Sequence, residues 1–233
     1  MIPCEFGTLH LPLAPQAPEI SSFWMDSLPN VAVCIAALLL AFLNVVGNRG
    51  LPPFLVGCLQ RKRGCEDLEH NLKRARGRNY CLPTVLLILA AVSDRFGLYR
   101  PGFAGILPDE WSIAVCAAAL LAYALIRDIL HRLLRPRRLK GDASEALRCC
   151  IPTFAVILCP PLALTACGLV LFGVPDAAAG IVVLIETAVL YVFSIVREFQ
   201  ILADRYPVLI SFLYLCTLEF LPAALLIVSA VLI

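Results

Sequence analysis

Charged residues are scarce in this sequence. Asp, Glu, Lys and Arg together make up 15% of its 233 residues, whereas hydrophobic residues make up 61% and the mean hydropathy is +0.87. A soluble domain is about one quarter charged and about half apolar, so this composition excludes water as the main solvent of the chain. Runs of about 18 or more apolar residues need roughly 30 Å of hydrocarbon to be buried. We therefore expect one membrane domain over nearly the whole length.

Motifs of known reaction centres are also lacking. The sequence has no Gly-rich phosphate loop, no nucleophile elbow and no paired-histidine metal motif. Neither Cys65 with His70, nor His131 with Cys149 and Cys150, has the spacing of a zinc site. No recognised binding fold accompanies the basic residues, so nucleic acid is not an expected partner. We expect a protein that is not an enzyme and that carries no cofactor or metal.

Basic residues are absent from the first 48 positions, and the first one is Arg49. A secretory signal needs a basic segment at its start, whereas this stretch carries acidic residues such as Glu5 and Glu19 and several prolines. We therefore interpret residues 1–28 as an extended tail in the periplasm and not as a signal sequence.

Six apolar segments follow the tail, and each has the length of a transmembrane helix, although the second is short and carries charges at Asp94 and Arg95. Pro or Gly occurs in most of the short connections between them. We therefore predict an all-α, polytopic membrane bundle of about six helices over residues 29–233. The segments lie at about residues 29–47, 80–96, 112–130, 149–173, 177–196 and 208–233.

Lys and Arg gather on one side of the predicted membrane. Of the 19, 17 fall in the connections after the first, third and fifth segments, Arg127 included, and only Arg95 and Arg100 fall on the other side. Cytoplasmic loops retain Lys and Arg. We therefore place basic loops at residues 48–79 and 131–148 in the cytoplasm and both termini outside. This organisation predicts a multi-pass protein of the bacterial inner membrane.

The first basic loop resembles an interfacial amphipathic helix. Leucines recur among its bases, and Glu69 precedes Lys73 by four residues, the spacing of a helical ion pair. Bases near a membrane surface are attracted to anionic headgroups by about 1 kcal/mol each. We expect lipid headgroups as the partner of this loop, and an acidic partner such as another envelope protein is the alternative. The contacting residues would be Arg61, Lys62, Arg63, Lys73, Arg74, Arg76 and Arg78.

Two glutamates, Glu186 and Glu219, lie inside predicted membrane segments, where a charge costs on the order of 3 kcal/mol unless it is neutralised or paired. Counting about 1.5 Å per residue from the inner boundary places both carboxyls at a similar depth. If adjacent helices bring them together, at least one must hold a proton. Two interpretations stay open: a proton or cation relay, or two protonated acids that hydrogen-bond between helices and fix their packing.

Three prolines predict bends in the membrane helices. Pro222 follows Glu219 by three residues, and its ring prevents the normal hydrogen bond to the Leu218 carbonyl. Pro160 and Pro161 have the same effect in the fourth segment. Bent helices beside buried carboxyls suit a permeation path, although Pro is common in membrane helices generally.

Cysteine is abundant, at 11 residues, but its placement argues against a disulfide framework. Cysteines inside apolar segments behave as small hydrophobic residues, and only Cys4 is expected to face an oxidising compartment. We predict no intramolecular disulfide. The cysteines inside apolar segments are Cys34, Cys116, Cys159, Cys167 and Cys216.

The end of the chain, from Phe212 to Pro222, resembles the closing signature of a bacterial inner-membrane family known as domain of unknown function 4271. Weaker similarity runs through Tyr123 and Arg127 and through the dipeptide at 159–160, so the resemblance covers most of the chain after residue 24. It implies an integral envelope protein without an established activity. It also implies that Glu219 is a characteristic polar residue.

Three classes of function follow from these observations. The leading hypothesis is a scaffold or accessory subunit of an envelope assembly, because topology and charged loops are the distinctive features. The alternative is a small proton- or cation-coupled transporter that uses Glu186 and Glu219. An intramembrane enzyme is least favoured, because no nucleophile with a neighbouring base is evident.

Overall fold

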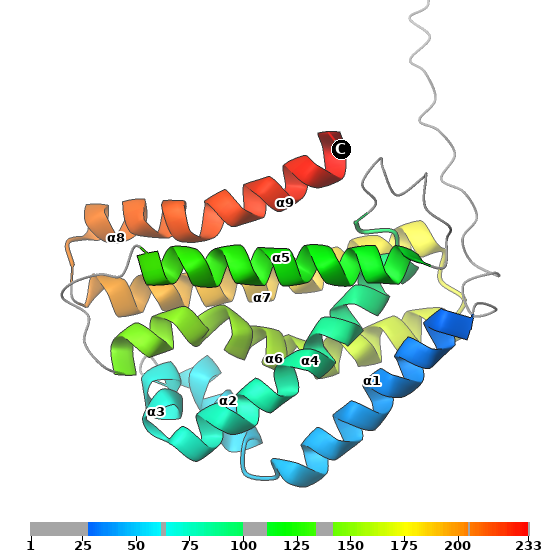
Figure 1. Cartoon of the computed structure of the whole chain (residues 1–233), viewed down its shortest axis with the longest axis horizontal. Coiled ribbons are helices and arrows are strands. Elements are labelled where there is room, and N and C mark those ends of the chain that lie inside the picture. The colour runs from blue at the N-terminus through cyan, green and yellow to red at the C-terminus, as the bar shows by residue number, and fades with distance from the viewer. Residues whose placement is uncertain (1–27, 62–63, 100–110, 134–141, 205, 233) are drawn as a thin grey trace, which may run out of the picture.

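The computed structural model describes residues 28–61, 64–99, 111–133, 142–204 and 206–232 (Figure 1). Every regular element in these residues is a helix, which confirms the predicted all-α class. Five helical segments are long and apolar enough to cross a membrane. They are α1 (Leu28–Gly47), α5 (Ser112–Leu133), α6 (Asp142–Leu171), α7 (Asp176–Ala203) and a last segment made of α8 (Val208–Leu215), the π-helical turn η4 (Cys216–Phe220) and α9 (Leu221–Leu232).

The predicted second span corresponds to α4 (Leu72–Arg95), which has 24 residues and packs against α1, α5 and α6. It is long enough to cross a membrane, but its first turns are basic and it is not among the five apolar segments. Successive long helices run in alternating directions, so that the start of α1 and the end of α9 lie at the same end of the bundle (Figure 1). The predicted tail lies outside the described residues except for Leu28.

Two helices on the side of these termini end in turns that require glycine. Gly173 has a positive φ of 62°, and the Gly173 and Val174 amides donate to carbonyls of the last turn of α6. Gly97, at φ 61°, ends α4 with the same pair of hydrogen bonds. This is the Schellman cap, which satisfies carbonyls that a helix end leaves free. It allows α7 to begin at Asp176, close behind α6.

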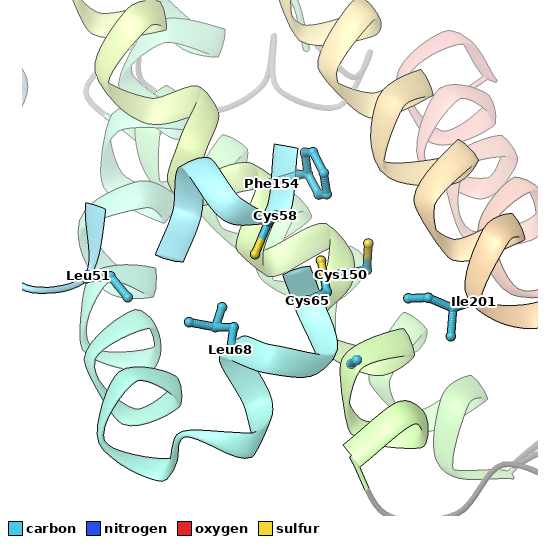
Figure 2. Packing of buried hydrophobic residues seen from close by; sticks show 8 residues of the cluster. Leu51, Cys58, Cys65, Leu68, Cys150, Phe154 and Ile201 are labelled. Carbon is cyan, nitrogen blue, oxygen red and sulfur yellow. The ribbon is translucent and has the colours of Figure 1, made fainter. Parts of the chain in front are cut away.

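The first basic loop differs from the predicted amphipathic helix, because it folds back into the bundle. It forms two short helices, α2 (Pro52–Gln60) and α3 (Gly64–His70), before α4 begins. Leu68 is fully buried in a core cluster with Cys58, Cys65 and Cys150, the last of which comes from α6 (Figure 2). The loop is therefore a packed cap on one end of the bundle and not a helix lying free on a surface.

The prolines act differently in the two helices. The chain changes direction between α8 and α9, where η4 precedes Pro222 (Figure 1), as a proline that removes a backbone hydrogen bond predicts. By contrast, α6 continues as a helix through Pro160 and Pro161 and through Pro152. Only the bend at Pro222 therefore coincides with an interruption of the α-helical hydrogen bonds.

Candidate functional site

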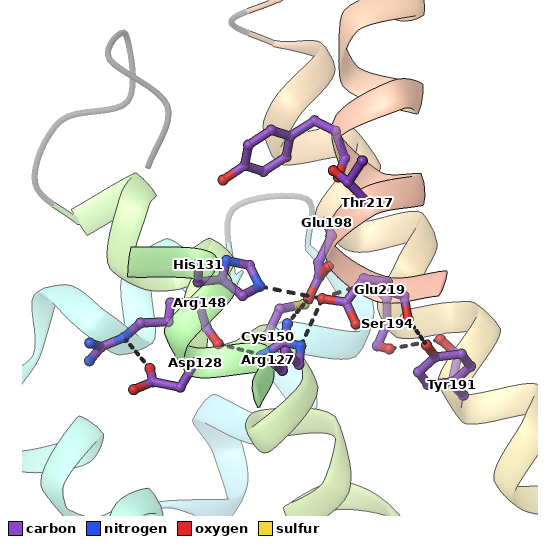
Figure 3. A network of polar contacts seen from close by, with 11 residues as sticks. Arg127, Asp128, His131, Arg148, Cys150, Tyr191, Ser194, Glu198, Thr217 and Glu219 are labelled. Carbon is purple, nitrogen blue, oxygen red and sulfur yellow. Dashed lines mark hydrogen bonds and ion pairs between the residues drawn. The ribbon is translucent and has the colours of Figure 1, made fainter. Parts of the chain in front are cut away.

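A buried arginine joins three elements that are far apart in the sequence. Arg127 of α5 donates from Nη2 to Glu198 Oε1 of α7 at 2.6 Å, and from Nε to Glu219 Oε1 of η4 at 2.7 Å (Figure 3). Its Nη1 donates to the Arg148 carbonyl of α6 at 2.8 Å. A guanidinium presents five donors in a rigid planar fork, so it can hold several acceptors at once, which a lysine ammonium at the end of a flexible chain does less well.

Burial makes these contacts electrostatically important. The exposed fraction of Arg127 is 3%, that of Glu198 is 1% and that of Glu219 is 0%. Charges taken out of water cost several kcal/mol each unless opposite charges and hydrogen bonds compensate them. One guanidinium here faces two carboxylates, so when both acids are ionised they carry one negative charge more than Arg127 neutralises.

A histidine adjoins the same carboxylate. His131 lies one helical turn beyond Arg127 on α5, is 6% exposed, and places Nε2 3.3 Å from Glu219 Oε1. Glu219 Oε2 is buried and has no hydrogen-bond partner among the described residues. A buried carboxylate oxygen without a partner is unusual, because buried polar atoms are nearly always hydrogen-bonded. We call Arg127, His131, Glu198 and Glu219 the ion cluster.

The backbone at Glu219 is also unusual. Glu219 lies in η4, a turn of π-helix between α8 and α9. Such turns are rare and often mark functional sites, because they insert an extra residue and redirect side chains. The Tyr191 hydroxyl of α7 donates to the Glu219 carbonyl at 3.4 Å, which adds a contact between η4 and α7 (Figure 3).

A chain of exposed charges borders the ion cluster at the end of the bundle that carries the basic loops. Arg148 Nε lies 3.7 Å from Asp128 Oδ1, and Arg148 also pairs with Glu145. These three side chains are one third to nearly one half exposed. Because the Arg148 carbonyl accepts from Arg127, this partly exposed network is directly connected to the buried charges.

The second glutamate singled out in the sequence lies elsewhere. Glu186 and Glu198 belong to the same unbroken helix α7, where twelve residues span about 18 Å. The structure therefore brings Glu219 together with Glu198, and Glu186 stays near the middle of α7. Glu186 is partly buried, and its Oε2 has no hydrogen-bond partner among the described residues.

Arg78, expected at a headgroup or partner surface, is instead 1% exposed. It pairs with Glu69 of α3 and donates to Thr153 Oγ1 of α6 at 3.2 Å. Glu69 thus pairs with Arg78 and not with Lys73, because a break at Asn71 separates α3 from α4. Burial raises the pKa of the Glu69 carboxyl, and the Arg78 charge acts in the opposite direction.

The other bases of that prediction are less enclosed. Arg61, Lys73 and Arg76 are exposed, and Arg74 is half-buried with its guanidinium 5.0 Å from the centre of the Phe54 ring. Lys62 and Arg63 lie outside the described residues. The exposed bases therefore remain candidates for contact with lipid headgroups or a partner.

The donor atoms of the ion cluster also meet the distance criterion for a metal site. One oxygen from each glutamate and one His131 nitrogen lie within 4.8 Å of one another. However, the guanidinium of Arg127 already bonds both carboxylates. A metal ion would have to be placed against this positive charge, so the arrangement favours proton exchange over metal binding.

Sequence reasoning missed two members of the ion cluster. Glu198 directly follows Arg197 beyond the predicted fifth segment, and His131 falls in the predicted second basic loop. One signal was available: Arg127 and His131 are four residues apart and therefore lie on one face of α5. Comparison of the chain with protein-family models, curated proteins and solved structures finds no match.

Proposed function

We propose that this chain is a small proton-coupled membrane transporter in which the ion cluster binds and releases one proton. The observation that carries the proposal is the free, buried Oε2 of Glu219 beside an arginine that is already shared by two acids. Intramembrane carboxyls and histidines that face the interior of a bundle are the usual components of proton relays.

The charge balance explains why one proton is exchanged. Both carboxylates ionised against one guanidinium leave an uncompensated negative charge in a site that excludes water. A proton on Glu219 Oε2 forms an O–H bond and removes that charge, and its loss restores it. Because Arg127 bonds the two acids through Glu198 Oε1 and Glu219 Oε1, a proton can come and go at Oε2 while both hydrogen bonds to Arg127 are kept.

His131 suits the delivery of that proton. It lies between Arg127 and the end of α5 at Leu133, and its Nε2 is 3.3 Å from Glu219 Oε1, the other oxygen of the carboxyl that holds the proton. An imidazole has two ring nitrogens, so one can accept a proton while the other releases one, which makes it a suitable proton shuttle. In this scheme protons enter from the side of the basic loops, pass His131 and reach Glu219. The low exposure of the ion cluster makes this an occluded state, so transport requires the helix ends to separate.

The test combines an infrared titration with transport. The purified chain should show a carboxyl band that titrates with pH, and E219Q should lose it. E186Q is the matched control, because it removes a membrane carboxyl that the structure places away from Arg127. In reconstituted vesicles, E219Q should abolish pH-dependent flux at normal abundance and E186Q should retain it. A titration that E219Q leaves unchanged would overturn the proposal.

A scaffold role is the second candidate, and the exposed bases Arg61, Lys73 and Arg76 favour it. Crosslinking and pulldown from cells should then recover a defined partner with the full chain. The double variant K73Q/R76Q should lose it, whereas R132Q, which removes an exposed base from α5, should keep it. Recovery of only the chain itself would contradict the scaffold role.

The placement in the membrane is part of the same proposal. The alternating helix directions and the central position of α4 favour six crossings, with the basic loops in the cytoplasm and both termini outside. The resemblance to domain of unknown function 4271 favours a bacterial inner membrane, and it coincides with the ion cluster at Glu219.

A further inference from the structure

A cavity of about 550 Å³ lies on one side of the ion cluster. Its wall is built by α5 on one side and by α6 and α7 on the other, and α4, the turn that follows α4 and the start of α9 contribute the rest. This size falls within the roughly 300–1,000 Å³ of small-molecule sites. Buried side chains such as Leu158, Leu162 and Val183 make most of the lining apolar.

The polar groups of the lining differ in whether they are available to hydrogen-bond a ligand. The Thr187 hydroxyl donates to the Val183 carbonyl and the Ser194 hydroxyl to the Tyr191 carbonyl, so both are bonded within α7. The buried Tyr123 hydroxyl makes no hydrogen bond of good geometry with the described residues, although it lies beside Tyr191. A buried hydroxyl without a partner costs about 1–3 kcal/mol, and a ligand atom in the cavity would remove that cost.

Tyr123 also connects the cavity to the ion cluster. It lies four residues before Arg127, on the same face of α5. Tyr191, which also lines the cavity, donates to the Glu219 carbonyl. Tyr123 and Tyr191 therefore place hydrogen-bonding groups at the end of the cavity nearest the buried charges.

The opening of the cavity indicates where its occupant comes from. Leu184 lines the cavity and is nevertheless 56% exposed. On the same face of α7, Ile181, Ile185 and Val189 are exposed to a similar degree. This apolar face belongs to one of the candidate membrane spans, so in a bilayer it contacts hydrocarbon. Molecules that reach the opening from this side are those that dissolve among lipid chains.

From these observations we infer that the cavity binds a membrane-dissolved amphiphile with one hydrophobic body and one uncharged, hydrogen-bonding head such as a hydroxyl. The body fills the space between α5 and the α6–α7 pair, and the head bonds Tyr123. An uncharged head fits because it adds no charge beside the ion cluster. The inference that this amphiphile is the transported substrate rests on the proposed proton coupling. The inference that it binds in the cavity does not.

Photolabelling of the purified chain in lipid nanodiscs tests the inference. The probe is a long-chain alcohol with a diazirine on its chain, and the comparison probe is the matching hydrocarbon without the hydroxyl. The alcohol should label Leu158 and Val183, which line the cavity but are 6% and 0% exposed, and unlabelled alcohol should compete. Labelling confined to outward residues such as Ile185 and Val189 would overturn the inference.

Two variant pairs sharpen the result. A119F places a ring in the cavity lining, whereas A118F places the same ring on the exposed face of α5. A119F should reduce labelling of Leu158 about tenfold or more, and A118F should not. Y123F should weaken labelling by the alcohol about fivefold, the effect of one hydrogen bond, and leave labelling by the hydrocarbon unchanged. Equal labelling of the two alanine variants would contradict the cavity site even if A119F folds normally.

The outcome separates the two proposals. E219Q should still be labelled at Leu158, because the head bonds Tyr123 and not the carboxyl. If labelling succeeds while the carboxyl titration fails, the cavity site stands and proton coupling falls. If the titration succeeds while labelling fails, the ion cluster stands and its substrate is not an amphiphile of this class.

Discussion

Arg127 and Glu219 are 92 residues apart in the sequence, yet Arg127 Nε lies 2.7 Å from Glu219 Oε1 in a site closed to the outside. The same guanidinium bonds Glu198 and the Arg148 carbonyl. One side chain of α5 thereby ties together α6, α7 and η4. Replacement of this arginine should therefore destabilise the whole bundle.

We expect R127M to lower the free energy of unfolding by about 3–5 kcal/mol, because it leaves two buried carboxylates without their cation. Thermal unfolding in detergent measures the change. R132Q is the control: Arg132 forms an exposed pair with Asp128, which contributes about 0–1 kcal/mol.

A second variant distinguishes electrostatics from packing. R127M/E198L/E219L removes all three charges and should recover much of the stability that R127M alone loses. Unfolding of R127M at the wild-type temperature would show that the arginine does not hold the helices together.

The Arg78–Glu69 pair predicts that replacing Arg78 lowers the stability of the fold by an amount that depends on pH. In R78M, the buried Glu69 carboxyl loses its partner, and burial keeps its pKa above the ordinary 4.5. A raised pKa in the folded state means that folding favours the protonated acid. The loss of folding stability caused by R78M should therefore be small below about pH 4.5, grow as pH rises through the raised pKa, and be largest near neutral pH.

The measurement is the difference in melting temperature between the wild type and R78M as a function of pH. R76Q, at an exposed position two residues away, should show a small difference at every pH. A penalty for R78M that is the same at acid and neutral pH would mean that lost packing of the arginine, and not the stranded carboxyl, causes it.

The cysteines should form no disulfide and should differ in reactivity. Among the described residues no cysteine is in a disulfide; Cys167 is exposed, and Cys58, Cys65 and Cys150 are buried. A membrane-permeant maleimide should modify Cys167 in the folded chain and the three buried thiols only after unfolding. A non-reducing gel should show no internal bridge, and a faster-migrating oxidised monomer would contradict this prediction.

Reporter fusions should decide the number of crossings. With six crossings through α4, fusions near Arg61 and near residue 138 should both report the cytoplasm, and a fusion at Val174 should report the opposite side. If α4 does not cross, the first two fusions will lie on opposite sides of the membrane. The control is expression of each fusion at similar abundance.

The sequence predicted the helices better than the contacts between them. Long apolar segments can be recognised locally, because each must match the thickness of the bilayer. The structure of the first basic loop was harder to predict. Its bases indicated a surface helix, but Leu68 and Arg78 are buried, because α3 packs against α6. That packing depends on a partner about 80 residues away, which no local pattern reveals.

The site was predicted in part for the same reason. Glu219 could be singled out because it is the only acid in a long apolar segment. Glu198 could not, because it follows Arg197 near the expected boundary, while α7 in fact continues to Ala203. Arg127 was counted as one of the bases that mark the cytoplasmic side. Depth counting paired Glu219 with Glu186, whereas the π-helical turn and the arginine orient it toward Glu198.

The turn η4 has a structural consequence of its own. A π-helical turn holds about one residue more than an α-helical turn, so it shifts the angular phase of α9 relative to α8 by about the 100° that one residue subtends. The two halves of the last segment consequently present different faces: α8 packs against α7, whereas α9 packs against α5. A single polypeptide segment thus changes neighbours halfway along its length, and Glu219 lies at the point of exchange.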